Sequence, residues 1–347
     1  MSQVRLVHLL GLQYTLRQML TIGRYKISSV VMARFRLDGG AMFGVVPKVL
    51  WEKLEPPDES NRIQLVMRSL LAVDPAAPGR PRVILVDSGA GTKWPPDEAA
   101  RYVIEPLPEA LPAALAQHDL TEADVTDVIV THLHFDHNGG ITEWAGSPAP
   151  QPSPLKREGA TSSQPSPSKG EGTGAGRATR LRFPQARHWL HRRHWEYVDH
   201  PTEKDRASFL ERDYEALRRA PLVEGRDGQP GLVLVDGAEP ASIIDGIRWF
   251  VSRGHTPYQL LPIFEGADGD LLFTGDVIPT ASHLRPAWVM AYDLEPLVTI
   301  AEKRRMLAAC QAEGLQLAFP HDRQVAGARI TIEKDRPTMA AKLELEP

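Results

Sequence analysis

One short segment of the sequence concentrates side chains that can bind a metal ion. Residues 131–140 read Thr-His-Leu-His-Phe-Asp-His-Asn-Gly-Gly and contain His132, His134, Asp136 and His137. In an extended chain, the alternation of His132 and His134 points both imidazoles to the same side. The next pair, Asp136 and His137, can turn toward a second point. Because imidazole and carboxylate are the usual ligands of zinc and related divalent ions, the segment predicts a metal site rather than a solvated polar loop.

Three further segments place a ligand-type residue just after a predicted strand. They are the segments that end in Gly-His255-Thr-Pro, Thr-Gly-Asp276 and Phe-Pro-His321. In open α/β sheets, binding sites gather at the carboxyl ends of strands. We therefore expect these residues, although distant in sequence, to converge on the histidine-rich segment.

Short apolar runs alternate with helical patterns, and together they predict the elements that position these side chains. The runs predict strands at 83–86, 125–131, 247–252, 271–274 and 315–319. The helical patterns predict helices at 108–118 and 297–313, the second of them closed by Gly314. Strands interleaved with helices indicate an α/β protein.

Composition and charge exclude several classes of protein. The chain has 347 residues, of which 42% are hydrophobic and 24% charged, and this is the ordinary globular range. The 40 basic and 44 acidic residues give a net charge of −4, which argues against a nucleic-acid-binding protein. The single cysteine, Cys310, excludes an intrachain disulfide and a zinc site of several thiolates. It lies within a predicted helix, and we expect it in the core.

Two segments differ from the rest of the chain. Residues 147–177 lack aromatic residues and are rich in Pro, Ser and Gly, so we expect a low-complexity disordered insertion, with a Pro-rich docking segment as the alternative. Residues 1–22 have no continuous apolar run or cleavage site, so we expect an N-terminal extension rather than a signal peptide. No window offers the ~18 consecutive apolar residues of a membrane span. We expect a cytoplasmic protein.

Together, these landmarks resemble the metallo-β-lactamase fold hydrolases over most of the chain, from about residue 27 to residue 322. The matching stretches are Val86-Asp-Ser-Gly89, residues 131–137, Gly254-His-Thr-Pro257, Thr274-Gly-Asp276 and Pro320-His321. The resemblance implies an αββα four-layer sandwich with a two-metal site at one edge of the paired sheets. The hydrolase domain would span 23–347, interrupted by the insertion at 147–177.

The resemblance also implies a ligand set. Carried over by position, His132, His134 and His255 would hold a first metal ion, and Asp136, His137 and His321 a second. Asp276 would bridge the two ions, for which we expect two divalent cations, Zn²⁺ above others. A carboxylate rather than a thiolate at Asp276 resembles the lactonase, glyoxalase II and organophosphate hydrolase branches.

The chemistry expected of such a site is hydrolysis. Two divalent ions about 3.5–4 Å apart can share a water molecule and lower its pKa toward about 7. A metal-bridging hydroxide would then cleave a small ester or lactone, as in quorum-quenching lactonases, with Asp136 as ligand and as catalytic proton donor to the leaving group. The alternatives are a phosphotriesterase or phosphodiesterase on the same site, and a metal-binding scaffold without turnover. The expected partners are a small-molecule substrate and, in a homodimer, a second copy of the chain; neither nucleic acid nor a membrane is expected.

Four details leave alternatives open. Asp87 either orients a ligand imidazole or only forms the turn after its strand. Known acyl-homoserine lactonases carry a tyrosine three residues after the bridging aspartate, where this chain has Pro279, and this difference argues against a specific homoserine-lactone substrate. Tyr258, His283 and Tyr292 could supply a substitute hydrogen bond, but we expect each of them to be a structural or surface residue.

The other two details concern segments. Residues 187–197 are expected to form a basic, solvated helix with Trp189 and Trp195 partly buried, and a pocket lining is the alternative. Residues 35–44, with Gly39-Gly40 and the flanking Met42 and Phe43, are expected to form a mobile apolar lid over the metal site.

Overall fold

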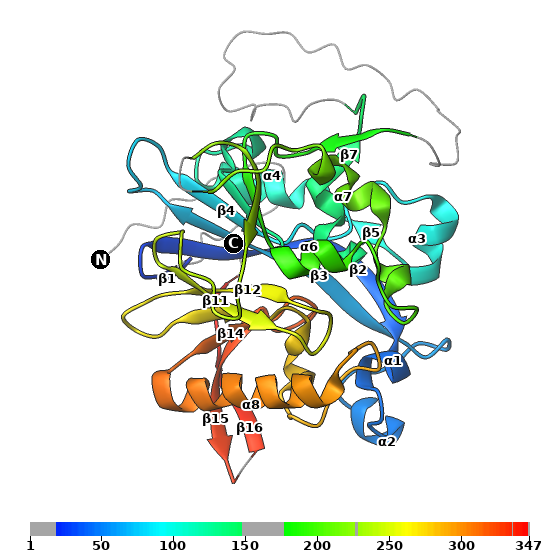
Figure 1. Ribbon diagram of the computed structural model, residues 1–347. Helices are drawn as coiled ribbons and strands as arrows, with labels where there is room; N and C mark the ends of the chain where they lie inside the picture. Colours follow the sequence, from blue (N-terminus) through cyan, green and yellow to red (C-terminus); the bar gives the residue numbers. More distant parts are fainter. Residues whose placement is uncertain (1–18, 148–176, 226–227, 335, 346–347) are drawn as a thin grey trace, which may run out of the picture.

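Two β-sheets face each other, and helices cover the outer face of each, in the computed structural model of the protein (Figure 1). The structure describes residues 19–147, 177–225, 228–334 and 336–345. From top to bottom in Figure 1 the layers are α4 (Ala110–Ala116) with α7 (Glu211–Arg218), the first sheet, the second sheet, and α8 (Pro296–Glu313). The expected α/β class and αββα sandwich are confirmed.

The first sheet mixes an antiparallel half with a parallel half. Its strands, in spatial order, are β1 (Leu20–Ile22), β2 (Tyr25–Asp38), β3 (Arg62–Asp74), β4 (Arg82–Val86), β6 (Asp127–Ile129), β9 (Arg187–His191) and β10 (Gly231–Val235), and β5 (Glu105–Pro106) pairs with β2. The pairs from β1 to β4 are antiparallel and those from β4 to β10 are parallel. Strand β4 is apolar throughout because Val83 and Leu85 pack toward α4, whereas Ile84 and Val86 face the second sheet.

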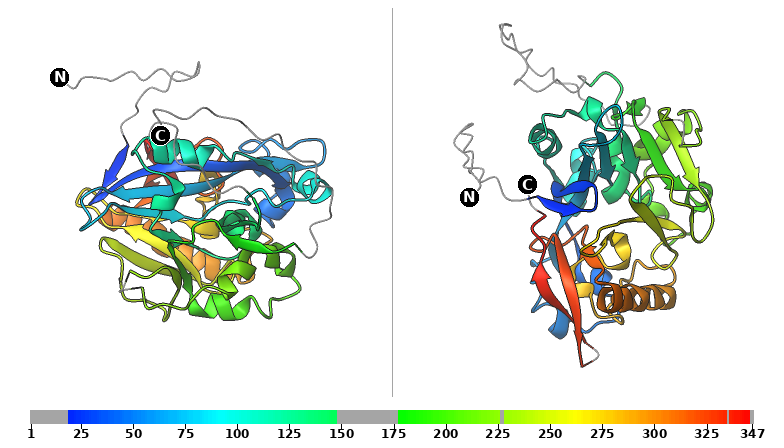
Figure 2. Two further views of the ribbon diagram at one scale, coloured as in Figure 1. Left: turned by 90° about the horizontal axis from the view of Figure 1, so that it is seen from above. Right: turned by 90° about the vertical axis from the view of Figure 1, so that its left-hand side faces the viewer.

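The second sheet is built from the C-terminal part of the chain. Its order is β11 (Ile247–Ser252), β12 (Gln259–Phe264), β13 (Leu271–Phe273), β14 (Gln316–Ala318), β15 (Gly327–Glu333) and β16 (Arg336–Lys342). Only the β13–β14 pair of this sheet is parallel. The β15–β16 hairpin extends beyond the other layers (Figures 1 and 2). Strands β7 (Thr142–Trp144) and β8 (Thr179–Leu181) form a separate pair.

Helix α8 shows why the outer layers form. Its buried residues recur every three to four positions, at Thr299, Glu302, Lys303, Met306, Leu307 and Cys310, and this stripe packs on the second sheet. Pro296 occupies the first turn and Gly314, at φ +71°, closes the helix. Cys310 is a core residue as expected, and burial raises the pKa of its thiol to about 12. The remaining helices are α1 (Gly39–Phe43), α2 (Lys48–Trp51), α3 (Pro96–Tyr102), α5 (Phe135–Asn138) and α6 (Arg192–Tyr197).

The predicted strands and helices are all present, with ends within two residues of those expected. The interpretation of residues 187–197 as one solvated helix is wrong in its first half, since 187–191 form the fully buried strand β9. Trp189 lies between the two sheets, and its indole Nε1 donates to Asp127 Oδ1 at 2.8 Å. Because β9 contains histidines and arginines, its sequence lacks the apolar pattern expected of a strand that is buried on both faces.

Two predicted segments fall largely outside the described residues. Of the predicted extension 1–22, residues 1–18 are outside, and Leu20–Ile22 form β1. Of the predicted insertion 147–177, residues 148–176 are outside. Among the described residues, none of the helices combines the length and hydropathy that a membrane crossing needs.

A buried lysine on α8 contacts the loop that precedes this helix. Lys303 is fully buried, and its ammonium donates to Trp288 O at 2.6 Å. Burial lowers the pKa of Lys303 to about 7, although Asp293 opposes the shift. The unfolded chain therefore binds a proton between pH 7 and about 10 that the folded chain does not.

This difference predicts that stability rises with pH through that range. Relative to Lys303→Met, which carries no titrating group, the wild-type unfolding free energy should increase by a few kcal/mol between pH 7 and pH 10. Urea unfolding of both proteins at several pH values measures it. A wild-type-to-variant difference that is independent of pH would show that Lys303 titrates normally.

Candidate metal centre

The seven predicted ligand residues all lie at the carboxyl ends of strands. His132 and His134 follow β6, and Asp136 and His137 lie on the short helix α5 that comes next. His255 follows β11, Asp276 follows β13 and His321 follows β14. Each of the seven residues is at most 8% exposed. The sandwich therefore brings together at one edge residues that are up to 189 positions apart (321 minus 132).

Their ligand atoms form two groups. One contains His132, His134, His255 and Asp276, the other contains Asp136, His137 and His321, and within each group the atoms lie within 4.8 Å of one another. Asp276 faces both groups. Its Oδ2 is 3.2 Å from His255 Nε2, while its Oδ1 is 3.2 Å from His137 Nε2 and 3.1 Å from His321 Nε2.

The arrangement suits divalent cations. His132 Nε2 and His255 Nε2 lie 3.1 and 3.2 Å from His134 Nδ1, and His137 Nε2 lies 3.1 Å from His321 Nε2. Each such pair of ring nitrogens can share only one proton, so several lone pairs remain unsatisfied. Within the described chain, buried Asp276 Oδ1 receives no hydrogen bond of ordinary geometry. Cations on the two sides of Asp276 would satisfy these atoms, and the His/Asp donor set is one that zinc accepts.

Burial and charge favour the metal-binding protonation state of three predicted ligands, His132, His134 and Asp276. The nearby carboxylates, in contrast, raise the pKa of His137 and His255 against the effect of burial. Burial lowers the pKa of His132 and His134 well below the usual value, so both rings are neutral. Burial alone would raise the pKa of Asp276, but His137, His321 and His255 lower it well below its usual range. Burial would also lower the pKa of His137, yet the carboxylates of Asp276 and Asp136 raise it well above normal. An ion binding here would displace the His137 proton.

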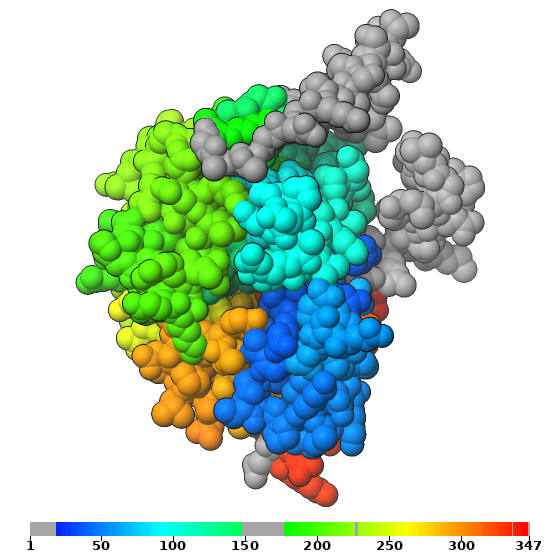
Figure 3. Space-filling model, turned by 90° about the vertical axis from the view of Figure 1, so that its right-hand side faces the viewer, coloured from blue at the N-terminus to red at the C-terminus, as the bar shows by residue number. Residues whose placement is uncertain are grey.

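A cavity of about 170 Å³ opens onto both groups. One wall is apolar and aromatic and consists of Leu37, Met42, Tyr102, Phe135, Met290 and Tyr292. The rest of the lining consists of Lys204, Asp205, Ala207 and Ser208 together with five predicted ligands, His134, Asp136, His255, Asp276 and His321. The segments that supply these walls, blue, cyan, green and orange, meet on one face of the molecule (Figure 3).

The expectation for residues 35–44 holds in part. Leu37 and Met42 border the cavity, so the segment lies beside the predicted metal site. It is not a loop: Asp38 ends β2 and caps α1 by accepting from Ala41 N at 2.8 Å. Phe43 is fully buried and stacks on Trp51 and His283. Because it packs inside the protein, Phe43 is a core residue and not part of a mobile lid.

Comparison with known proteins finds one family model that resembles part of the chain. Residues 79–162 match the model of the metallo-β-lactamase superfamily. This match covers less than half of the chain and includes four of the predicted ligands, His132, His134, Asp136 and His137. Among curated proteins, no significant match was found.

Solved structures with this superfamily's fold align over nearly the whole chain. A probable metal-dependent hydrolase from Staphylococcus aureus is 24% identical, with a TM-score of 0.71 over 93% of this chain and 98% of that one. The dizinc quorum-quenching lactonase AidC is 12% identical, with a TM-score of 0.64 over 94% and 97%. The hydrolase AbOPH is 15% identical, with a TM-score of 0.65 over 95% and 98%. At these identities, the likeness establishes the fold.

Two of the predicted ligand rings are held from behind by a hydrogen bond to their outer nitrogen. His137 Nδ1 bonds Asp87 Oδ2 at 2.8 Å, and His321 Nδ1 bonds Val66 O at 2.8 Å. Asp87 forms the turn after β4, at φ +57°, and it also contacts the ring of the predicted ligand His137 and accepts from Thr131 N at 2.8 Å. Such outer partners fix the tautomer and orientation of a ligand.

Two residues of this outer layer were missed in the sequence. Asp293 Oδ1 lies 3.0 Å from His255 Nδ1, and no motif around it signals that role. His194 accepts from Leu133 N at 2.9 Å and contacts Pro257 O at 2.7 Å, so it joins two ligand-bearing loops. Both partners of His194 are backbone atoms, which leave no signature in sequence.

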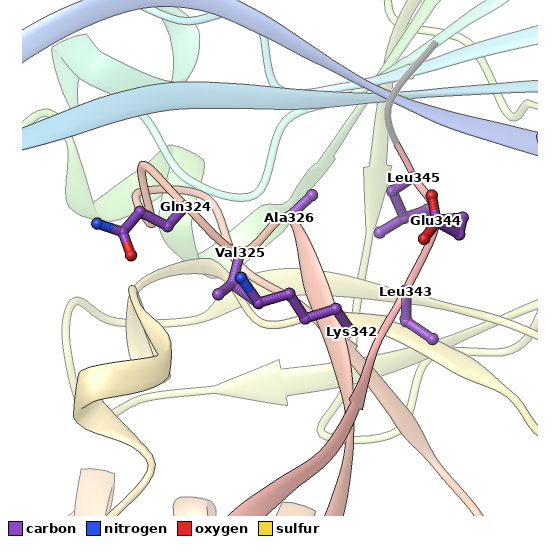
Figure 4. A pocket seen from close by; sticks show the side chains of 7 residues that line it. All are labelled: Gln324, Val325, Ala326, Lys342, Leu343, Glu344 and Leu345. Atoms are coloured by element: carbon purple, nitrogen blue, oxygen red, sulfur yellow. The ribbon is translucent and has the colours of Figure 1, made fainter. Parts of the chain in front are cut away.

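A second cavity, of about 210 Å³, lies at the end of the second sheet (Figure 4). It is lined by Gln324, Val325, Ala326, Lys342, Leu343, Glu344 and Leu345. These residues include no histidine or cysteine and a single carboxylate. This cavity therefore lacks the histidine and aspartate donors that line the first one.

The contact between Asp87 and His137 predicts that Asp87→Asn weakens metal binding by about 10–100-fold. Asparagine tolerates a positive φ and can still accept one hydrogen bond, so the fold should survive while the charge behind His137 is lost. Chelator competition with Zn²⁺ measures the affinity. Asp97→Asn, an exposed residue of α3, is the matched control and should bind as wild type; equal affinity for the Asp87 variant would contradict the orienting role.

Proposed function

We propose that the protein is a dinuclear zinc-dependent hydrolase that cleaves a small ester or lactone. The observation that carries the proposal is the position of Asp276, whose two carboxylate oxygens each face one of two His-rich groups at the base of a cavity. His132, His134 and His255 would hold the first ion and Asp136, His137 and His321 the second. When bound, two such ions lower the pKa of a water molecule toward about 7 and polarise a carbonyl oxygen.

Asp136 is the group of this chain best placed to move a proton. Its carboxylate lines the cavity, and its Oδ2 lies 3.6 Å from His321 Nε2. A carboxyl group at the cavity surface can take a proton from the attacking water and donate it to the leaving alkoxide. The side chain would thereby serve both as ligand and as proton carrier.

Tyr292 supplies the hydrogen bond that Pro279 cannot. Of the three candidates from the sequence, Tyr292 lines the cavity. Tyr258 stacks on His191, and His283 is buried with its Nε2 on Met42 O at 2.8 Å. Burial, followed by the nearby Asp136 carboxylate, raises the pKa of the Tyr292 hydroxyl well above normal. The hydroxyl therefore keeps its proton and can donate to the substrate's carbonyl oxygen.

The walls of the cavity favour a substrate with an apolar arm. Leu37, Met42 and Met290 offer flexible apolar surface, and Phe135 adds an aromatic face. Water excluded by such an arm strengthens the electrostatic interactions at the reacting carbonyl. The small volume limits the substrate to one of modest size, and this agrees with a lactone or aryl ester.

An assay panel separates this proposal from its alternatives. Zinc-loaded protein should hydrolyse a lactone or an aryl ester, lose the activity to a chelator, and regain it with Zn²⁺. Turnover of a phosphotriester alone would favour the phosphotriesterase alternative. Stable binding of metal without turnover of any substrate would favour a scaffold, and one ion per chain would end the dinuclear assignment.

The ligand assignment predicts that His134→Ala and Asp276→Ala each reduce turnover to background, because each removes a donor that faces an ion. The matched controls are the exposed residues His200 and Asp268, whose alanine variants should keep wild-type activity. Metal content by elemental analysis accompanies the rates. Unchanged turnover in both site variants would refute the assignment.

The role of Tyr292 predicts that Tyr292→Phe lowers kcat by about 10²-fold and leaves KM nearly unchanged, since the bond forms mainly in the transition state. Tyr258→Phe is the control and should behave as wild type. Steady-state kinetics on the best substrate of the panel measures both. A change confined to KM would assign Tyr292 to substrate binding instead.

A further inference from the structure

A second buried lysine lies directly behind the ligand helix α5. Lys93 follows β4 and its side chain is 1% exposed. Its ammonium donates to Gly139 O and, at 2.8 Å, to Thr142 O. These carbonyls belong to the turn that leaves α5 just after Asp136 and His137. The lysine thus bonds the backbone of a ligand segment without touching a ligand.

Residues 87–93, which include Lys93, contact residues 137–142 along their whole length. Ser88 N donates to His137 O at 2.7 Å, and Gly140 N donates to Gly89 O at 2.9 Å. A Cβ on Gly139 would lie 2.4 Å from Ala90 O, so the two backbones touch with no room between them. Residues 137–142 therefore rest on residues 87–93, and Lys93 is the last of these supports.

The charge of Lys93 is balanced by the buried carboxylate of Asp213 on α7. The two groups are 3.1 Å apart, and each side chain is 1% exposed. A buried ion pair is costly to desolvate, and well-packed apolar residues of similar volume often give equal stability. Thr142 Oγ1 also donates to Arg212 O at 2.9 Å, so α7 holds the same turn from its other side.

We propose that Lys93, neutralised by Asp213, is a positioning residue for the second metal ion. It fixes the carbonyls of Gly139 and Thr142 and thereby the end of α5 that carries Asp136 and His137. The first group, on the loop before α5 and on the second sheet, does not depend on it. The inference rests on the proposed dinuclear function.

The test compares zinc stoichiometry and affinity in three proteins: wild type, Lys93→Met, and Lys93→Met combined with Asp213→Leu. Chelator competition should give two zinc affinities for wild type. In Lys93→Met one of the two binding steps should weaken by about 10–100-fold while the other stays within twofold. The double variant leaves no unpaired buried charge, so its urea midpoint should recover, but the zinc defect should persist because both carbonyls still lack their donor.

Each outcome is decisive. Recovery of zinc binding together with stability in the double variant would show a merely structural ion pair and overturn the inference. Equal loss at both zinc steps would also overturn it, and so would wild-type affinity in Lys93→Met. Leu115→Ala, a core change under the first sheet, is the control for destabilisation alone and should keep both affinities. If wild type binds a single ion, both the proposed dinuclear function and the inference about Lys93 fail. If wild type binds two ions and hydrolyses an ester, the experiment tests only the inference about Lys93.

Discussion

The structure depends on keeping seven buried ligand groups close together with few hydrogen-bond partners of their own. Several imidazole nitrogens of the site lie 3.1–3.2 Å apart, and the Asp276 carboxylate faces both groups. These contacts alone do not attract the side chains enough to fix their positions. Three of the imidazole rings are therefore held from outside the group. Asp87 bonds the outer ring nitrogen of His137, and Asp293 bonds that of His255. The outer ring nitrogen of His321 bonds the backbone carbonyl of Val66.

This support uses charged groups that are expensive to bury. Arg68, between the sheets, donates to Phe319 O at 3.1 Å and to Asp322 O at 2.7 Å, on either side of His321. Lys303 bonds Trp288 O, in the loop that also carries Asp293. Lys93 bonds the turn after α5. All three side chains donate hydrogen bonds to backbone carbonyls of loops, which is how a fold can define a loop that has no regular hydrogen-bond ladder of its own.

The pairing of the two sheets keeps the connections between the strands and the site short. Parallel strands β4 and β6, and parallel strands β13 and β14, end at the same edge of the sandwich, so short turns are enough to reach the site. The two sheets share an apolar core that includes Val86, Ile129 and Phe273, each at or near the end of a strand that leads to the site. Core packing and ligand placement are thus one problem, since a shift of either sheet would move one set of ligands relative to the other.

The sequence by itself determined the α/β class, most strand and helix positions, and all seven residues that converge, because each lies in a local pattern of an apolar run followed by a ligand-type residue. It could not determine β9, since the histidines and arginines of 187–191 conceal a strand that is buried on both faces. Nor could it show that 35–44 is core rather than lid, or that Tyr292 and not Tyr258 lines the cavity. Those facts, and the roles of Asp293, His194 and Lys93, depend on contacts with backbone atoms or with residues far along the chain. Only the tertiary structure decides such contacts, because no local spacing encodes them.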